Sequence, residues 1–222
     1  MPHSPADTWA ADVTALAPAA DPAAVRVAGN ELVARWTEPH RRYHTSQHLT
    51  EMLSAIDTLA AAAALEARMS CVAHVAAWLH DAVYDVHAAP GDSERASADL
   101  ARKLLTSLGV GPSDVRAIEE LILLTIDHGT GLAGPLANVF TDADLAILAA
   151  SPDRFDEYCA QVRAEYAHVP EAPYNQARSA ILAALVDRPE VYRTAYARAQ
   201  WTPAARANVS REISRLLSPL RE

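Results

Sequence analysis

The sequence predicts an all-helical protein, and three features of its composition and patterning support this prediction. Hydrophobic residues make up 50% of the 222 residues, glycine is scarce with 7 residues, and only 6% of the residues are aromatic. Alanine and leucine are abundant, which favours helix over sheet. No long run alternates polar and apolar residues as a half-buried strand would. We therefore expect a helical bundle of about nine or ten helices.

Prolines and small polar residues divide the chain into helical lengths. Asp21-Pro22 combines an N-cap with a proline at the first helical position, and predicts a helix over 22–36. Either Thr45 or Ser46 is expected to cap the next helix, whose apolar residues recur at the helical period. A third helix is expected over 66–86, because Ala89-Pro90-Gly91 breaks the chain after it.

The middle of the chain repeats these start and stop signals. Asp92-Ser93 caps a helix that is expected to end near Gly109. Pro112-Ser113 begins another, which is expected to end near Gly129. Thr141-Asp142 then predicts a short helix with Asp142 as its N-cap.

The C-terminal part is expected to contain four further helices. Ser151-Pro152 opens one that reaches about His168. Two segments follow over 174–186 and 189–199, and Thr202-Pro203 begins the last helix. We expect one domain over 1–222. Its core, at about 40–150, would carry the candidate site residues, and the helices of 151–222 would pack on that core.

Charge and cysteine content narrow the classes of function. The net charge of −9 argues against binding to a nucleic-acid backbone, which needs a basic face. A phosphate substrate remains compatible, because a bound metal supplies local positive charge. Cys71 and Cys159 form no CxxC pair and are expected to be reduced thiols, which favours a cytoplasmic location. We expect neither a signal peptide in Met1–Ala10 nor a membrane span.

The pair His80-Asp81 is the most informative candidate for chemistry. On a helix, His80 shares a mostly apolar face with Tyr84, and Asp81 and Asp85 lie on one neighbouring stripe. A charged aspartate beside a histidine on a buried helix is costly unless a cation neutralises it, and a divalent metal does so. The alternative is a helix boundary, with a core histidine and a solvated aspartate.

Histidines and a glutamate near this pair are further candidates. His44 and His48 are four positions apart, and His48 flanks an apolar stripe, so it points partly inward. Glu94 heads an apolar stripe, although an acidic residue in the first turn of a helix is also favoured by the helix dipole. His128 closes another apolar stripe, and the same dipole effect explains a histidine at a helix C-terminus.

Asp144 completes the set of possible ligands. It lies one turn before Leu148 and faces the same way, whereas Asp142 is accounted for as an N-cap. The candidates follow one another along the chain as His48, the pair His80-Asp81, and Asp144. Each is expected at the edge of an apolar helix face. Two histidines and two carboxylates leave coordination positions open for water and substrate.

With these residues in place, the chain resembles the HD superfamily of metal-dependent phosphohydrolases, which is named for its adjacent His-Asp. It is most similar to a bacterial subgroup described as predicted metal-dependent HD phosphohydrolases. The resemblance covers nearly the whole chain, through the segments YHxxxH (43–48), WLHDAVYD (78–85), SERASA (93–98), DADLAIL (142–148), EYAHV (165–169), AR-x-AIL (177–182) and AARANVSREI (204–213). Ala177 departs from the glycine that often precedes the arginine in that subgroup.

The resemblance implies a helical bundle of the HD type and specific residue roles. It assigns His48, His80, Asp81 and Asp144 as ligands of one divalent ion (Mn, Co, Mg, Zn, Ni or Fe). Asp85 matches a carboxylate that orients the attacking water, and Glu94 is a second candidate for handling its proton. The residues expected to contact the substrate or support the ligands are His44, His128, Asp142 and Arg178.

These roles predict hydrolysis of a small-molecule phosphoester or phosphoanhydride, a nucleotide among them. Arg41, Arg42 and Arg178 are candidates to contact phosphate oxygens. Alternatives are a nucleotide-binding regulatory module, an HD-type lyase or hydratase, and a di-iron oxygenase, which would need two more histidines such as His87 and His128. Both a monomer and a homodimer remain open.

Overall fold

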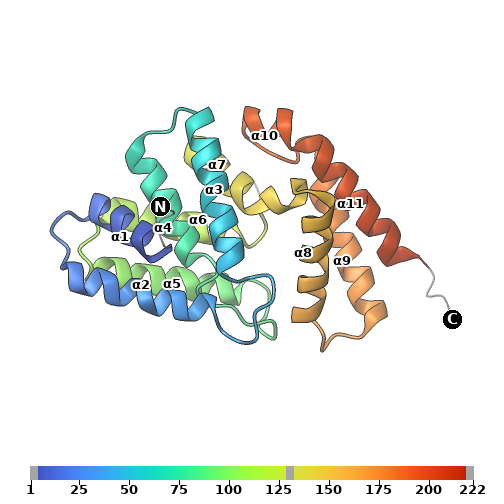
Figure 1. Ribbon diagram of the computed structural model, residues 1–222, viewed down its shortest axis with the longest axis horizontal. Helices are drawn as coiled ribbons and strands as arrows, with labels where there is room; N and C mark the ends of the chain where they lie inside the picture. The colour runs from blue at the N-terminus through green and yellow to red at the C-terminus, as the bar shows by residue number, and fades with distance from the viewer. Residues whose placement is uncertain (1–4, 129–132, 219–222) are drawn as a thin grey trace.

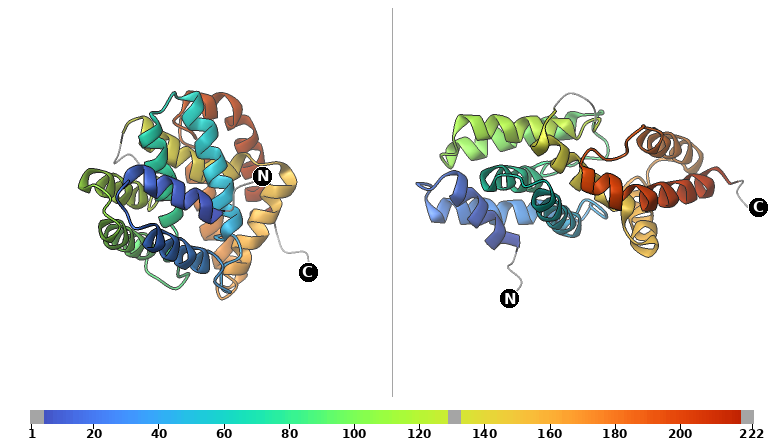
Figure 2. Two further views of the ribbon diagram at one scale, coloured as in Figure 1. Left: turned by 60° about the vertical axis from the view of Figure 1, so that its left-hand side comes forward. Right: turned by 90° about the horizontal axis from the view of Figure 1, so that it is seen from above.

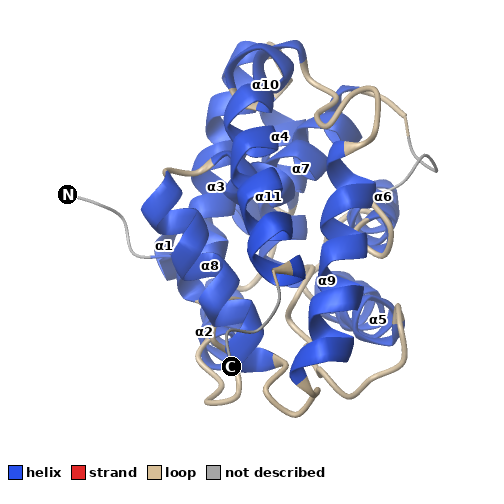
Figure 3. Cartoon of the chain, turned by 90° about the vertical axis from the view of Figure 1, so that its right-hand side faces the viewer, coloured by secondary structure: helices blue, strands red, loops and turns tan. Residues whose placement is uncertain are grey.

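The computed structural model describes residues 5–128 and 133–218, and every regular element in these ranges is helical (Figure 1, Figure 3). The elements are α1 (Pro5–Leu16), α2 (Pro22–Trp36), α3 (Ser46–Ala62), α4 (Ala67–Leu79), α5 (Asp92–Ser107), α6 (Pro112–Leu124), α7 (Pro135–Asp144), a 3-10 helix η1 (Leu145–Ala149), α8 (Pro152–Glu165), α9 (Glu171–Val186), α10 (Ala195–Gln200) and α11 (Thr202–Leu217). The all-helical prediction is confirmed.

Capping side chains begin several helices at the predicted positions. The Ala23 N–H donates to the Asp21 carboxylate over 3.0 Å at the start of α2. Thr45 accepts from the Gln47 N–H over 3.3 Å, and Ser151 accepts from the Arg154 N–H over 3.4 Å. Each bond satisfies one backbone N–H that the first turn of a helix leaves without an intrahelical partner.

Other predicted boundaries are wrong. Helix α1 was not expected at all. Helix α4 ends at Leu79 rather than Val86, and α6 ends at Leu124 rather than Gly129. Helix α7 begins at Pro135, so Asp142 lies in its last turn and is not an N-cap. Helix α10 begins at Ala195 rather than near Pro189.

Helix α4 is the centre of one end of the molecule. It packs against α1, α3, α5, α6 and α7, while α9 and α11 pack against each other at the other end, next to α8 (Figure 1, Figure 2). The buried residues of α4 include Ala73, Ala76 and Ala77, whose small side chains let neighbouring helices approach closely. The buried apolar residues form one continuous cluster.

Three buried tryptophans lie around α4. The rings of Trp9 and Trp78 meet edge to face at 5.9 Å. The Trp36 Nε1–H donates to the Trp78 carbonyl over 3.0 Å, which supplies a partner near the end of α4. Gly29 is required on α2, because a Cβ there would lie 2.7 Å from the Trp9 ring. No helix in the described ranges is both long and apolar enough to cross a membrane.

Candidate metal centre

Four side chains bring possible ligand atoms together where α3, α4 and α7 meet; we refer to them as the His-Asp cluster. His48 lies in the first turn of α3, His80 and Asp81 follow α4, and Asp144 ends α7. His48 Nε2 lies 3.3 Å from His80 Nε2, 3.8 Å from Asp81 Oδ2 and 3.4 Å from Asp144 Oδ1. His80 Nε2 lies 3.0 Å from Asp81 Oδ2 and 3.6 Å from Asp144 Oδ1. His48, His80 and Asp81 could hold a metal ion.

These spacings fit the ligand shell of a divalent ion. Ligands at about 2.0 to 2.2 Å from a metal, in tetrahedral or octahedral arrangement, lie roughly 2.8 to 3.6 Å from one another. Four of the five distances fall in this range, and the fifth, between His48 and Asp81 at 3.8 Å, is slightly wider. Two imidazoles and two carboxylates suit Mn, Fe, Co, Ni or Zn.

The other ring nitrogen of each histidine has its own partner. His80 Nδ1 lies 2.8 Å from the Ala77 carbonyl, which only accepts, so Nδ1 donates to it and Nε2 faces the cluster. His48 Nδ1 lies 3.1 Å from the Tyr43 hydroxyl. Such outer contacts orient ligating histidines.

The electrostatics of the cluster favour a cation. Burial alone would lower the pKa of His80, but the carboxylates of Asp81 and Asp144 raise it to about 9. Burial would likewise raise the pKa values of Asp81 and Asp144, yet His80 and His128 hold both below their usual range. The two carboxylates are therefore ionised at neutral pH, and positive charge is stabilised between them.

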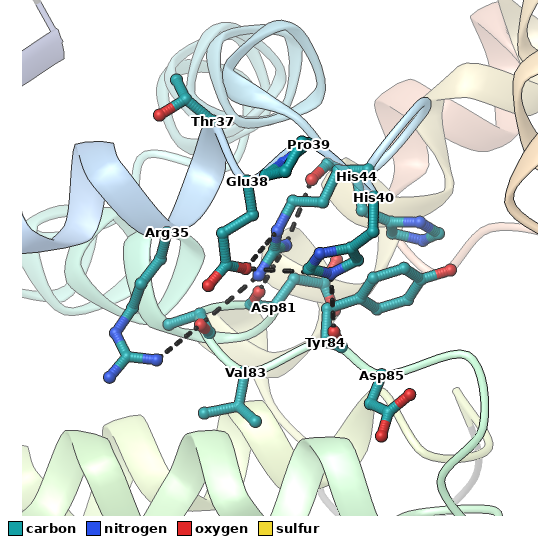
Figure 4. Close-up of polar contacts among 12 residues, drawn as sticks. Arg35, Thr37, Glu38, Pro39, His40, His44, Asp81, Val83, Tyr84 and Asp85 are labelled. Carbon is teal, nitrogen blue, oxygen red and sulfur yellow. Dashed lines mark hydrogen bonds and ion pairs between the residues drawn. The ribbon is translucent and has the colours of Figure 1, made fainter.

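The chain leaves helical geometry after α4 because distant side chains take its carbonyls. Arg41 Nη1 donates to the Asp81 carbonyl over 2.8 Å, and His40 Nε2 donates to the Tyr84 carbonyl over 3.0 Å. The Arg35 guanidinium reaches the Ala82 carbonyl at 3.4 Å. Figure 4 shows Arg35 and His40 directed toward this segment. The carbonyls freed by the early end of α4 are thus satisfied, and Asp81 is held beside His80.

The early end of α4 changes the place of Asp85. Asp81 and Asp85 do not share a helical stripe, so that prediction is wrong. Asp85 is exposed, and its Oδ1 accepts the His87 N–H over 2.9 Å in a tight turn. In Figure 4 its carboxylate points away from the Tyr84 ring.

A buried carboxylate on α8 fixes the segment that carries His44. Glu165 Oε1 accepts the backbone N–H groups of 42–44, over 2.7, 2.8 and 3.1 Å. Its Oε2 lies 2.7 Å from His44 Nδ1 and 2.9 Å from the Tyr84 hydroxyl, both of which donate. Burial opposes ionisation, but these bonds lower the pKa of Glu165 to about 2. His44 Nδ1 therefore carries a proton, and Nε2 is left for other partners.

The His-Asp cluster lies at a cavity of about 670 Å³ between the two ends of the molecule. Of the predicted residues beyond the cluster, five line this cavity: His44, Asp85, Glu94, His128 and Arg178.

His128 and Glu94 both line this cavity, but they differ in their hydrogen bonds. His128 Nε2 lies 2.8 Å from Asp144 Oδ2, so His128 holds the oxygen of Asp144 that does not face His48. Glu94, in the first turn of α5, forms no hydrogen bond or ion pair with another described residue.

Three further predicted residues lie away from the cavity wall. Asp142 is fully buried, and its carboxylate accepts the N–H groups of Arg193 and Thr194 over 2.8 and 2.7 Å. It therefore anchors the segment before α10 rather than supporting the metal ligands. The Arg41 guanidinium donates to backbone carbonyls. Arg42 is exposed and donates to the Pro39 carbonyl over 2.7 Å.

Sequence reasoning gave no role to Glu165 and Tyr43. Glu165 ends α8, where the helix dipole disfavours a carboxylate, and this position was a signal that it has a specific partner. Tyr43 shows no such signal, because its hydroxyl finds His48 only through the turn before α3.

Comparisons with known proteins found no match for this chain. No family model matches it. No curated protein and no solved structure matches it either. Membership of the HD superfamily stays a prediction from the motifs quoted above.

Proposed function

We propose that this protein is a metal-dependent hydrolase of a phosphoester or phosphoanhydride. The observation that carries the proposal is the His-Asp cluster, in which the Nε2 atoms of His48 and His80 lie within 3.8 Å of each other and of a carboxylate oxygen of both Asp81 and Asp144, at a cavity of about 670 Å³. Because these four residues line this cavity, coordination positions toward it would remain for water and substrate. A divalent ion bound there lowers the pKa of water and offsets charge on phosphoryl oxygens.

Residues of this chain orient the ligands and handle the proton. Tyr43 and the Ala77 carbonyl fix the two imidazoles, and His128 holds Asp144. Glu94 is the better candidate of the two predicted proton acceptors, because Asp85 already accepts the His87 N–H. His44 lines the cavity while its Nδ1 is held by Glu165, so its Nε2 is the atom left to contact a phosphoryl oxygen.

The oxygenase alternative lacks a residue that it needs. His87 is exposed, and its ring lies 4.2 Å from that of His168 rather than at the His-Asp cluster. Of the two additional histidines, only His128 lines the cavity.

Metal content and turnover test the proposal separately. Metal-free protein is reloaded with Mn²⁺, Co²⁺, Ni²⁺, Zn²⁺, Fe²⁺ or Mg²⁺, and each form is assayed with nucleotides and generic phosphoesters. We expect at least one form to release phosphate. His80→Ala and Asp81→Asn should lose both bound metal and turnover, whereas His168→Ala, an exposed histidine outside the cavity, should keep both. Retention of metal by His80→Ala, or inertness of every metal form, would overturn the proposal.

A further inference from the structure

We propose that Arg178 binds a second anionic group of the substrate, so that the cavity accepts compounds with a carboxylate or phosphate at a distance from the reacting phosphoryl group. The inference rests on the proposed function for the identity of the first group. It concerns the substrate class, which the His-Asp cluster alone leaves open.

Arg178 extends from α9 to the cavity wall. Its guanidinium donates to the Tyr158 hydroxyl, and its central carbon lies 5.1 Å from the centre of the Tyr158 ring. The phenol thus holds the guanidinium by a hydrogen bond and a cation–π contact. The side chain has a defined position on the cavity wall before any ligand binds.

The charge of Arg178 has no anionic partner among the described residues. A guanidinium has five N–H donors, and the single hydrogen bond found for Arg178 uses one of them. Arg188, the other arginine of the described cavity wall, instead donates to the carbonyls of His128 and Asp127 over 2.9 and 3.1 Å. Glu94 lines the same cavity but forms no ion pair with Arg178. A partly buried cation without a carboxylate is costly, and an anionic ligand would offset that cost.

The surroundings of Arg178 separate it from the His-Asp cluster. The Tyr43 ring lies 4.8 Å from the His48 ring on one side and 4.5 Å from the Tyr158 ring on the other. Arg178 is thus linked to the candidate ligand His48 through the rings of Tyr158 and Tyr43 rather than by a direct contact. Since Arg178 contacts none of the four residues of the His-Asp cluster, we assign it to a group of the substrate other than the reacting phosphoryl group.

Several described residues of the wall near Arg178 are apolar or phenolic, although Glu94 lines the same cavity. Tyr166, Ile181 and Leu185 line the cavity beside it. Surroundings of low polarity strengthen a charge-assisted hydrogen bond. A carboxylate or phosphate on a short carbon chain fits a wall of this composition.

Matched pairs of phosphonates test the proposal by binding, without turnover. The probes are phosphonoacetate, 3-phosphonopropionate and 4-phosphonobutyrate, each paired with the alkylphosphonate of the same length. Isothermal titration measures each Kd with Mn²⁺-loaded protein. For the wild type we expect the carboxylate member to bind about tenfold or more tightly at one chain length at least, as for a hydrogen bond to a charged group.

Variants assign that preference to one residue. Arg178→Met should bring the ratio of the two Kd values near one while leaving the alkylphosphonate Kd unchanged. Arg102→Met removes an exposed arginine of α5 and should keep the wild-type ratio. Arg178→Lys should keep part of it, because lysine retains the charge but not the planar pair of donors. The lysine variant and the wild-type series remain informative if Arg178→Met does not fold.

The outcomes separate this inference from the proposed function. A wild-type ratio near one at every length, or an unchanged ratio in Arg178→Met, overturns the role of Arg178 even if phosphoesters are hydrolysed. An Arg178-dependent ratio in a protein that turns over no phosphoester supports the anion site and refutes the hydrolase.

Discussion

Glu165→Gln measures how strongly one buried carboxylate stabilises the segment before α3. The amide keeps one oxygen, which can still accept the backbone N–H groups of 42–44. Its NH2 group, however, replaces the oxygen to which His44 Nδ1 and the Tyr84 hydroxyl donate, at 2.7 and 2.9 Å. The NH2 group cannot accept, so the His44 N–H and the Tyr84 hydroxyl lose their charged acceptor in a site without solvent access for the side chain.

Two estimates of the magnitude agree. Hydrogen bonds to a charged group contribute about 1.5 to 3 kcal/mol each, so losing two of them should cost about 3 kcal/mol or more. The pKa of Glu165 is lowered from 4.5 to about 2, against the effect of burial, by His44 and by backbone N–H groups. That shift corresponds to about 3 kcal/mol of stability at neutral pH.

The sign of the pH dependence follows from the lowered pKa. The stabilisation is complete above the unfolded pKa of 4.5 and is lost as the pH falls toward the folded pKa of about 2. Urea unfolding should therefore show a difference of about 3 kcal/mol between wild type and Glu165→Gln at pH 7, reduced by about 1 kcal/mol at pH 4.

The control is Glu157→Gln, an exposed carboxylate on the same helix, which should change stability by less than about 0.5 kcal/mol. A Glu165→Gln effect below about 1 kcal/mol, or one that grows at pH 4, would refute the reasoning.

Three further changes have definite expected results. Burial would lower the pKa of His74, but two carboxylates 3.1 Å from its ring nitrogens raise it above 6.5, so its stabilisation is full below that pH. The unfolding free-energy difference between wild type and His74→Gln should shrink as the pH rises above 6.5 and through the raised pKa of His74. Tyr43→Phe should weaken metal binding about tenfold or more, measured by competition with a chelator, because His48 loses its outer partner; unchanged affinity would contradict this. Asp142→Ala should cost about 2 to 4 kcal/mol in urea unfolding yet leave metal content unchanged, since its bonds hold Thr194; loss of the metal would contradict the separation.

Capping residues close in sequence were sufficient to predict most helix starts. The prediction failed where a helix end depends on a contact with a residue far away in the sequence. The side chains of Asp21 and Ser151 accept backbone N–H groups two and three positions away, so both partners of each hydrogen bond can be recognised in a short stretch of sequence. The end of α4 depends instead on Arg41, which is 40 positions from Asp81. Helix periodicity continues past Leu79 in the sequence and carries no sign of that contact.

The same distinction applies to the candidate site. His48 and Asp144 could be proposed because each lies at the edge of an apolar helix face, and the structure brings both beside His80. The role of Glu165 could not, because the residues that donate to it lie 121 to 123 positions earlier or at Tyr84. Asp142 resembled an N-cap only because the true start of α7, at Pro135, precedes it by two turns.

The origin of the His-Asp cluster in three helices has a consequence for folding kinetics. His48 and His80 are 32 positions apart, and Asp144 follows much later in the chain. An early helix would hold at most the adjacent pair His80-Asp81, so tight binding of an ion at the proposed site would await the docking of α3 and α7 on α4. Contacts of such long sequence separation form late or slowly in refolding. A spectroscopically visible ion such as Co²⁺ would therefore report the moment when these three helices first meet, separately from the earlier rise of helical signal.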